Sequence, residues 1–186
     1  MFRELHLLKN LFVPPERFWK KIYLAGTCEL TNDEKELLRI ALLGISSALD
    51  AFPPSKSDLK LNIFVIDTDK FTLHFNDPHS LGYHVSFIIL PVGRWREVKY
   101  SSGSILIAML EELCHDIWGI IDENIVKLRV EAVLKYIFPT LSARALYAQI
   151  VVENQEYCLN LASQDVSQHQ REIHEQSDNQ KTSAPE

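Results

Sequence analysis

The segment between Thr31 and Pro54 constrains the possible folds more than any other part of the sequence. Thr31 and Glu34 have the spacing of a capping box, in which two side chains cap the backbone at the start of a helix. Apolar residues then recur every three or four positions until Pro53 and Pro54 end the pattern. We therefore predict an amphipathic helix over about residues 32–51, whose apolar face needs a core to pack against.

The segments on both sides of this helix differ in their periodicity. Between Pro15 and Gly26, aromatic and aliphatic residues recur at helical spacing, which predicts a short helix with an aromatic face. After the long helix, runs of alternating apolar residues or of β-branched and aromatic residues predict three strands. These runs cover residues 61–65, 71–75 and 83–92.

The remaining sequence before the tail predicts helices. Capping residues and helical periodicity mark three of them, over residues 105–118, 122–138 and 142–161. The chain order of two helices, three strands and further helices favours an α+β fold over alternating βαβ units. We expect N-terminal helices, a small three-stranded or larger mixed sheet, and C-terminal helices.

The composition is that of one globular domain followed by a polar tail. The chain has 186 residues, of which 46% are hydrophobic, and this suffices for one sizeable core. Almost no residue after position 162 is apolar, so this segment cannot bury enough surface to offset the entropy of ordering it. We expect a single domain over residues 1–162 and a disordered tail over residues 163–186.

Charge, hydropathy and cysteine content exclude several classes of protein. The net charge of −6 comes without basic blocks, so we expect no nucleic-acid partner. No run approaches the roughly 20 apolar residues of a membrane span, so we expect no membrane partner. Three widely spaced cysteines fit neither a disulfide framework nor a zinc knuckle. These features predict a protein of a reducing compartment, with a cytoplasmic location.

Residues 110–118 hold the densest group of candidate catalytic side chains. Glu111 and His115 are four positions apart on a predicted helix, so they share a face and can hold one metal ion between them. Glu112 can hold a water molecule beside them as a general base. Without a metal, the neighbouring carboxylates repel one another, which raises at least one pKa. The same residues also fit a solvated helix face and an ordinary hydrogen-bonded histidine.

The sequence Glu111-Glu112-Leu113-Cys114-His115, which follows an apolar strand and precedes Asp122-Glu123, resembles the core of zincin-like metallopeptidases of the short, glutamate-ligand type. The resemblance covers about residues 32–138. In that family the motif H-E-x-x-H supplies two metal ligands and the base, and a downstream helix supplies a third, carboxylate ligand. The strand before the motif helix binds extended substrate at the sheet edge. The resemblance implies that Glu112 is the catalytic base and that His115 and Glu123 bind metal.

Glu111 stands where the family motif has its first histidine. A metal site of Glu111, His115 and Glu123 offers one nitrogen and two carboxylates. This set suits Zn²⁺ and also the harder ions Mn²⁺ and Fe²⁺. A zinc site that loses an imidazole usually loses affinity, so a protein without any metal is the other expectation.

Several residues near the motif have simpler interpretations. Asp122 can cap the next helix, and Glu123 can pair with Lys127 one turn on. Cys114 cannot use His115 as a base, because adjacent helix residues diverge by about 100°, so we expect it in the core. Apolar residues at helical spacing on the two helices are expected in the core as well. They are Leu110, Leu113, Ile117 and Ile121 on the first, and Ile125, Leu128, Val133 and Ile137 on the second.

Three functions fit this sequence. The first is a zincin-like protein that no longer cleaves peptides and acts by binding a protein or peptide partner. The second is a metal-dependent peptidase or other hydrolase with a Glu-His-Glu metal site. The third is a plain structural or interaction domain. We favour the first, because the motif indicates the fold more strongly than it indicates the activity, and a fold does not determine a function.

Overall fold

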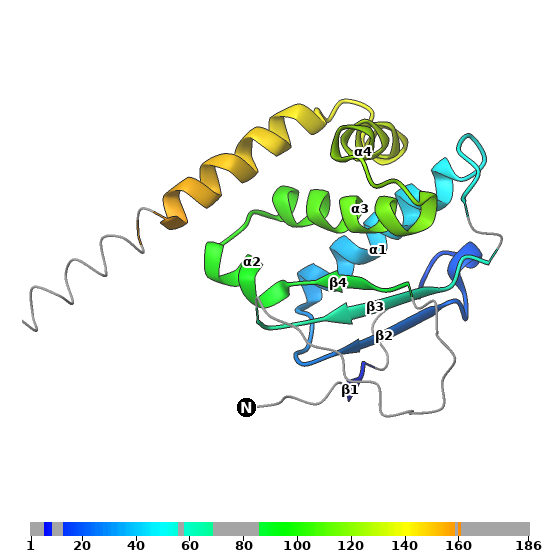
Figure 1. Cartoon of the computed structure of the whole chain (residues 1–186), viewed down its shortest axis with the longest axis horizontal. Helices are drawn as coiled ribbons and strands as arrows, with labels where there is room; N and C mark the ends of the chain where they lie inside the picture. Colours follow the sequence, from blue (N-terminus) through cyan, green and yellow to red (C-terminus); the bar gives the residue numbers. More distant parts are fainter. Residues whose placement is uncertain (1–5, 9–12, 56–57, 69–85, 159, 161–186) are drawn as a thin grey trace, which may run out of the picture.

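In the computed structural model, a four-stranded mixed sheet is covered by helices on one face (Figure 1). The structure describes residues 6–8, 13–55, 58–68, 86–158 and 160. Helices α1 (Asn32–Ala48) and α3 (Ser102–Trp118) lie next to the sheet. Helix α4 (Glu123–Ile137) lies on the side of α3 that faces away from the sheet. The α+β class predicted from the sequence is confirmed.

The strands follow one another across the sheet in chain order. They are β1 (His6–Leu7), β2 (Ile22–Gly26), β3 (Leu61–Val65) and β4 (Ile88–Leu90). β1 runs antiparallel to β2, whereas β2, β3 and β4 are parallel. Strand β2, helix α1 and strand β3 therefore form one βαβ unit, which the sequence analysis did not predict.

The short helix predicted between Pro15 and Gly26 is wrong. Only Glu16–Phe18 forms a single 3₁₀ turn (η1), and the chain is already extended at Trp19. Strand β2 follows, with Leu24 and Ala25 buried between the neighbouring strands. Pairing with two strands that are distant in sequence outweighs the local helical spacing of the aromatic residues.

The strand predicted over residues 83–92 is confirmed only in part. Of its described residues, 86–92, only those of β4 form a strand, while residues 83–85 and the predicted strand 71–75 lie outside the described residues. Pro91 separates β4 from a helix that was not predicted, α2 (Val92–Val98). Val92, Trp95 and Val98 of this helix are buried at helical spacing. The seven-residue length of α2 is too short for its periodicity to stand out in the sequence.

The helices predicted over residues 32–51, 105–118 and 122–138 are confirmed, each with a capping residue. Thr31 and Glu34 form the capping box of α1, Ser101 caps α3, and Asp122 caps α4 through the backbone N–H groups of Asn124 and Ile125. A last helix covers residues 143–158, and the predicted tail, 163–186, lies outside the described residues. None of the described helices has both the length and the apolar content that a membrane crossing requires.

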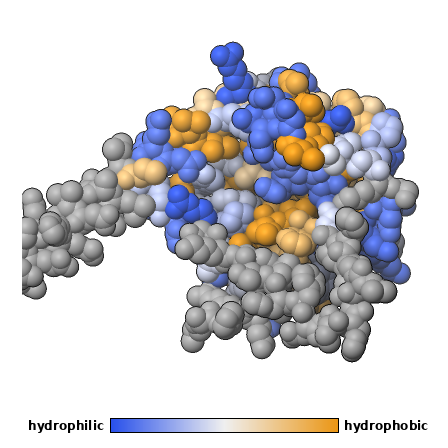
Figure 2. Space-filling view, in the orientation of Figure 1, coloured by the Kyte–Doolittle hydropathy of each residue, from blue (hydrophilic) through white to orange (hydrophobic). Residues whose placement is uncertain are grey.

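The core lies between the sheet and the helices, and the phase of α4 differs from the prediction. Leu110, Leu113 and Ile117 are buried as predicted, and so is Val133. Three residues that were predicted in the core are exposed instead: Ile121, Ile125 and Leu128. The buried face of α4 is made by Val126, Val130, Val133 and Leu134. Apolar side chains accordingly reach the surface over α4 (Figure 2).

Adjacent leucines on α1 provide a direct test of this packing. Leu42 is fully buried, whereas Leu43 is 41% exposed. Leu42→Ala should lower the free energy of unfolding by about 2–5 kcal/mol, because it leaves a cavity in the core. Leu43→Ala should change it by about 0.5 kcal/mol or less. Urea denaturation of both variants measures the difference, and equal losses would contradict the described orientation of α1.

An ion pair between buried Glu34 and exposed Arg96 connects the start of α1 to α2. The Glu34 carboxylate accepts hydrogen bonds from Arg96 Nε at 2.9 Å and Arg96 Nη2 at 2.7 Å, and also from the backbone N–H of Thr31 at 2.7 Å. Arg96 Nη2 donates as well to the backbone oxygen of Glu29 at 2.8 Å. Burial alone would raise the pKa of Glu34, but the hydrogen bonds from Arg96 and Thr31 outweigh it and lower this pKa. The pair joins the loop after β2 to the helix after β4.

The lowered pKa of Glu34 predicts a loss of stability in acid. A carboxyl group with a depressed folded pKa contributes stability above its unfolded pKa of about 4.3, and this stability is lost as the pH falls through the folded pKa. Glu34→Gln should cost about 2 kcal/mol or more at pH 7, and little at the lowest pH where the fold persists. Glu36→Gln, at an exposed pair with Arg39, is the matched control and should have little effect. Melting temperatures of the wild type and both variants between pH 3 and pH 7 measure these losses, and an equal loss for the two variants would contradict the prediction.

Candidate functional site

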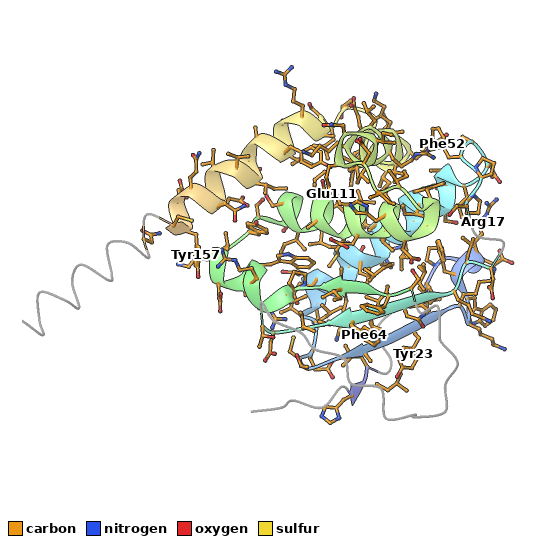
Figure 3. The ribbon with its side chains drawn as sticks, viewed as in Figure 1. Arg17, Tyr23, Phe52, Phe64, Glu111 and Tyr157 are labelled. Atoms are coloured by element: carbon orange, nitrogen blue, oxygen red, sulfur yellow. The ribbon has the colours of Figure 1, made fainter. Side chains whose placement is uncertain are left out.

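Helix α3 carries the candidate site on the strip that its neighbours leave open. The helix contacts α1, α4 and β4, and its apolar side chains fill these contacts. Glu111 and His115 are both half-buried on the same side, as their four-residue spacing predicts, and Glu112 is exposed. Glu111 lies on the part of α3 that runs below α4 and the last helix (Figure 3). At the other side of the strip, the hydroxyl of Ser86 donates to Asp116, next to the start of β4.

Glu111 lies among groups from α4 and from the last helix. Burial is the largest cause of a raised pKa for its carboxyl group, and the charge of Glu123 acts in the same direction. The Tyr147 hydroxyl, Lys127 and His115 act in the opposite direction. Glu111 is therefore a poorly hydrated carboxylate with a cation and a phenol beside it. Burial, rather than the expected repulsion among the motif carboxylates, is the main cause of this raised pKa.

Tyr147 is the part of this environment that sequence reasoning missed. Its hydroxyl group is buried and makes no hydrogen bond of ordinary geometry with a described residue. Burial and the neighbouring Glu111 raise the pKa of Tyr147. The ammonium group of Lys127 lies 5.5 Å from the centre of its ring. No motif surrounds Tyr147 in the sequence, so only the packing of the last helix reveals its proximity to Glu111.

His115 is held by the turn that follows α3. Its Nδ1 lies 2.6 Å from the backbone oxygen of Ile120, and its Nε2 lies 3.6 Å from Oε1 of Glu123. A neutral imidazole that donates from Nδ1 to the carbonyl presents an unprotonated Nε2 to Glu123. A protonated imidazole forms an ion pair with the same carboxylate. Both forms hold the ring in one orientation.

Glu112 is the least enclosed member of the motif. Its side chain is exposed, and it makes no hydrogen bond or ion pair with another described residue. The pKa of Glu112 is raised mainly because neighbouring groups displace water from its carboxyl group. The charges of Glu111 and Glu123 raise this pKa further, and the charge of His115 lowers it. A carboxylate with a raised pKa and access to water fits a general base. This geometry leaves the role implied for Glu112 chemically feasible.

The predicted metal ligands are brought together only in part. His115 and Glu123 lie within 4 Å of each other. Glu111 is close enough for their charges to change its pKa, but Tyr147 and Lys127 lie beside its carboxylate as well. Within the described part of the chain, no three His, Cys, Asp or Glu side chains are close enough together to hold a metal ion. A three-ligand site would require Glu111 to turn away from Tyr147.

The simpler interpretations of the neighbouring residues have mixed outcomes. Asp122 is the N-cap of α4, as predicted. Cys114 is fully buried, and burial raises the pKa of its thiol to about 12, so it is an unreactive core residue. The ion pair predicted between Glu123 and Lys127 is wrong, because Glu123 faces His115 and Lys127 lies over the ring of Tyr147.

Arg129 marks a second polar group that the sequence did not reveal. Its guanidinium carbon lies 4.0 Å from the ring centre of Phe52 and 4.7 Å from that of Trp118. Trp118 also donates a hydrogen bond of 2.9 Å to the backbone oxygen of Phe52. Nη1 of Arg129 is buried without a hydrogen bond to a described residue. The stacked arginine ties α4 to the end of α3 and to the segment after α1.

Two grooves lie on the outer side of α4. One, of about 440 Å³, lies between Phe52, Leu128 and Tyr136. The other, of about 430 Å³, lies between Leu128, Arg144 and Tyr147. Both include Leu128, so they are adjacent along the helix. The candidate metal ligands line neither groove.

The chain was compared with protein families, with curated proteins and with solved structures. No family model, no curated protein and no solved structure matches it.

The raised pKa of Glu111 predicts the effect of removing its charge. A carboxyl group with a raised folded pKa adds stability below its unfolded pKa, and this stability is lost as the pH rises through the folded pKa. In metal-free protein at pH 7, Glu111→Gln should therefore raise the melting temperature by on the order of 2 °C. The gain should shrink toward pH 4. Glu156→Gln, at an exposed position of the last helix, should show no such dependence. A lower melting temperature for Glu111→Gln at pH 7 would contradict the described environment.

Proposed function

We propose that this protein is a zincin-like protein that has lost peptide hydrolysis and acts by binding a protein or peptide partner. One observation carries the proposal. Glu111, at the first ligand position of the motif, is half-buried beside Tyr147, while His115 and Glu123 face each other. A hydrolytic metal centre needs its ligands directed at one point with an open coordination position. The half-buried carboxylate contributes to helix packing instead.

The arrangement of elements also supports a zincin-like protein. Strand β4 is one of the two edge strands of the described sheet, and after α2 it is followed in the chain by α3 with the motif and α4 with Glu123. This is the order that the resemblance implies for the substrate-binding strand, the motif helix and the helix with the third ligand. The order of the elements supports a common ancestry with zincins, whereas the orientation of the site side chains is what bears on catalytic activity.

A metal-dependent hydrolase is the second candidate, and the geometry of His115 favours it. A neutral imidazole that donates from Nδ1 to the carbonyl of Ile120 has its Nε2 lone pair directed toward Glu123. Such a hydrogen bond to a carbonyl is the usual support of a metal-binding histidine. His115 and Glu123 would hold Zn²⁺, Mn²⁺ or Fe²⁺, with Glu111 as third ligand after a side-chain rotation. The metal would polarise the substrate carbonyl, and Glu112 would accept the proton of the attacking water.

Restoring the histidine separates the two candidates. Glu111→His should create a tighter zinc site, because it returns a second imidazole four positions before His115. Bound metal stabilises the fold by RT ln(1 + [L]/Kd), which is roughly 2.7 kcal/mol at a concentration of 100 times Kd. Melting curves with and without Zn²⁺ should show a shift for Glu111→His and almost none for the wild type or for Glu111→Gln.

Two outcomes would change the conclusion. If the wild type responds to Zn²⁺, Mn²⁺ or Fe²⁺ as strongly as the variant and cleaves a peptide library in a Glu112-dependent manner, the protein is a hydrolase. If no variant responds to any of the ions, the site lacks zincin geometry and the proposed ancestry is wrong.

A further inference from the structure

Helix α4 has a second apolar face that nothing in the described structure covers. Ile121 is 91% exposed and Leu128 is 67% exposed, and Ile125 and Tyr136 are exposed as well. These four residues define the α4 surface. Within the helix, Ile125, Leu128 and Tyr136 point to the same side, because intervals of three and eleven residues return to nearly the same direction, and Ile121 lies just before the N-cap residue Asp122. Figure 2 shows apolar patches among charged groups over this part of the molecule.

The α4 surface is hollowed on both sides of Leu128. The groove toward Phe52 and the groove toward Tyr147 share Leu128 and Glu131, and their volumes are about 440 and 430 Å³. A ridge of one large side chain between two grooves is the shape into which side chains of a second helix interdigitate. The stripe and the grooves together run along most of α4, whose 15 residues span about 22 Å.

The charges around the α4 surface differ in sign from the protein as a whole. Lys127, Lys135 and Arg144 line the grooves together with one acidic residue, Glu131. Glu131 is already paired with Lys135 at 3.1 Å. Neither Lys127 nor Arg144 has an acidic partner within 4 Å among the described residues. Arg144, which has no acidic partner within this distance, and Lys127, which lies near Glu111 and over the ring of Tyr147, therefore border an apolar stripe on a chain whose net charge is −6.

We propose that the α4 surface binds an amphipathic helix of a partner protein whose apolar stripe is flanked by Asp or Glu residues. This proposal rests on the proposed binding function and specifies its surface and its partner. A helix fits better than an extended peptide, because α4 presents no free sheet edge with which the backbone of a strand could pair. Acidic flanks complement Lys127 and Arg144, and an apolar stripe fills the grooves beside Leu128.

Three peptides provide the test. The first is a labelled, designed helix of four turns with Leu and Ile on one face and Glu along its flanks. The second carries Lys in place of the flanking Glu residues, and the third is a scrambled form of the first. Fluorescence anisotropy with the full chain should show binding of the acidic helix. The lysine-flanked helix and the scrambled peptide should bind at least about tenfold more weakly.

Variants of exposed residues locate the binding. Leu128→Glu and Ile125→Glu should weaken binding of the acidic helix by about tenfold or more, as expected for central contacts of an interface. Arg144→Glu should reverse the preference toward the lysine-flanked helix. Val152→Glu, on the side of the last helix opposite the groove residue Ala143, is the matched control and should bind like the wild type. Each variant is checked for an unchanged melting temperature, which its exposed position predicts.

The outcomes that overturn the proposal are distinct. Failure of the acidic helix to bind, equal binding of the lysine-flanked helix, or an equal loss for Val152→Glu each excludes it. Sedimentation that shows a dimer of the wild type and a monomer of Leu128→Glu would assign the α4 surface to a second copy of the chain. Leu128-dependent binding to anionic lipid vesicles, without binding of the acidic helix, would assign it to a membrane. A different result would overturn the proposed function, namely metal-dependent cleavage of peptides that requires Glu112.

Discussion

The enclosure of α3 by other elements determines both the core and the candidate site. The helix contacts α1 and α4 on two sides and β4 on a third, and Leu110, Leu113 and Ile117 fill these contacts. A helix surrounded in this way has one narrow strip for ionisable side chains. A charged group placed elsewhere on α3 would be buried without a partner, at a cost of several kcal/mol. The motif residues therefore share this strip whether or not they bind a metal.

The end of α3 sets the geometry at His115. Gly119 adopts a left-handed conformation with φ of 63°, which other residues adopt at a cost of roughly 1 kcal/mol. This turn ends the helix and brings the carbonyl of Ile120 to 2.6 Å from Nδ1 of His115. It also leads the chain to Asp122, which caps α4 and places Glu123 opposite Nε2. Four residues between two helices thus orient the histidine and its carboxylate partner together.

The parts of the structure that the sequence predicts well are those that depend on local interactions. The caps at Thr31, Ser101 and Asp122 form within one helical turn, and α1 and α4 begin where their caps predict, whereas α3 begins three residues before the predicted start at Ile105. Strand β2 was missed because its stability comes from pairing with β1 and β3, which the local sequence does not specify. In the site, the spacing of Glu111 and His115 predicted their common side of α3. The contact of Glu111 with Tyr147 depends on a separate helix and has no local signal.

Helix α4 shows why apolar periodicity could not identify its buried face. Its apolar residues lie on two sides, with the valines Val126, Val130 and Val133 on one and Ile125 and Leu128 on the other. The valines and Leu134 are buried because this side of α4 packs on α1 and α3. The approach to α1 is close at Gly44, where an added Cβ atom would force the side chain of Ile137 to shift. The choice between the two apolar sides therefore depends on contacts with other helices, which the local sequence of α4 does not specify. A helix with two apolar faces needs partners on both sides, and the described part of this chain supplies a partner for one.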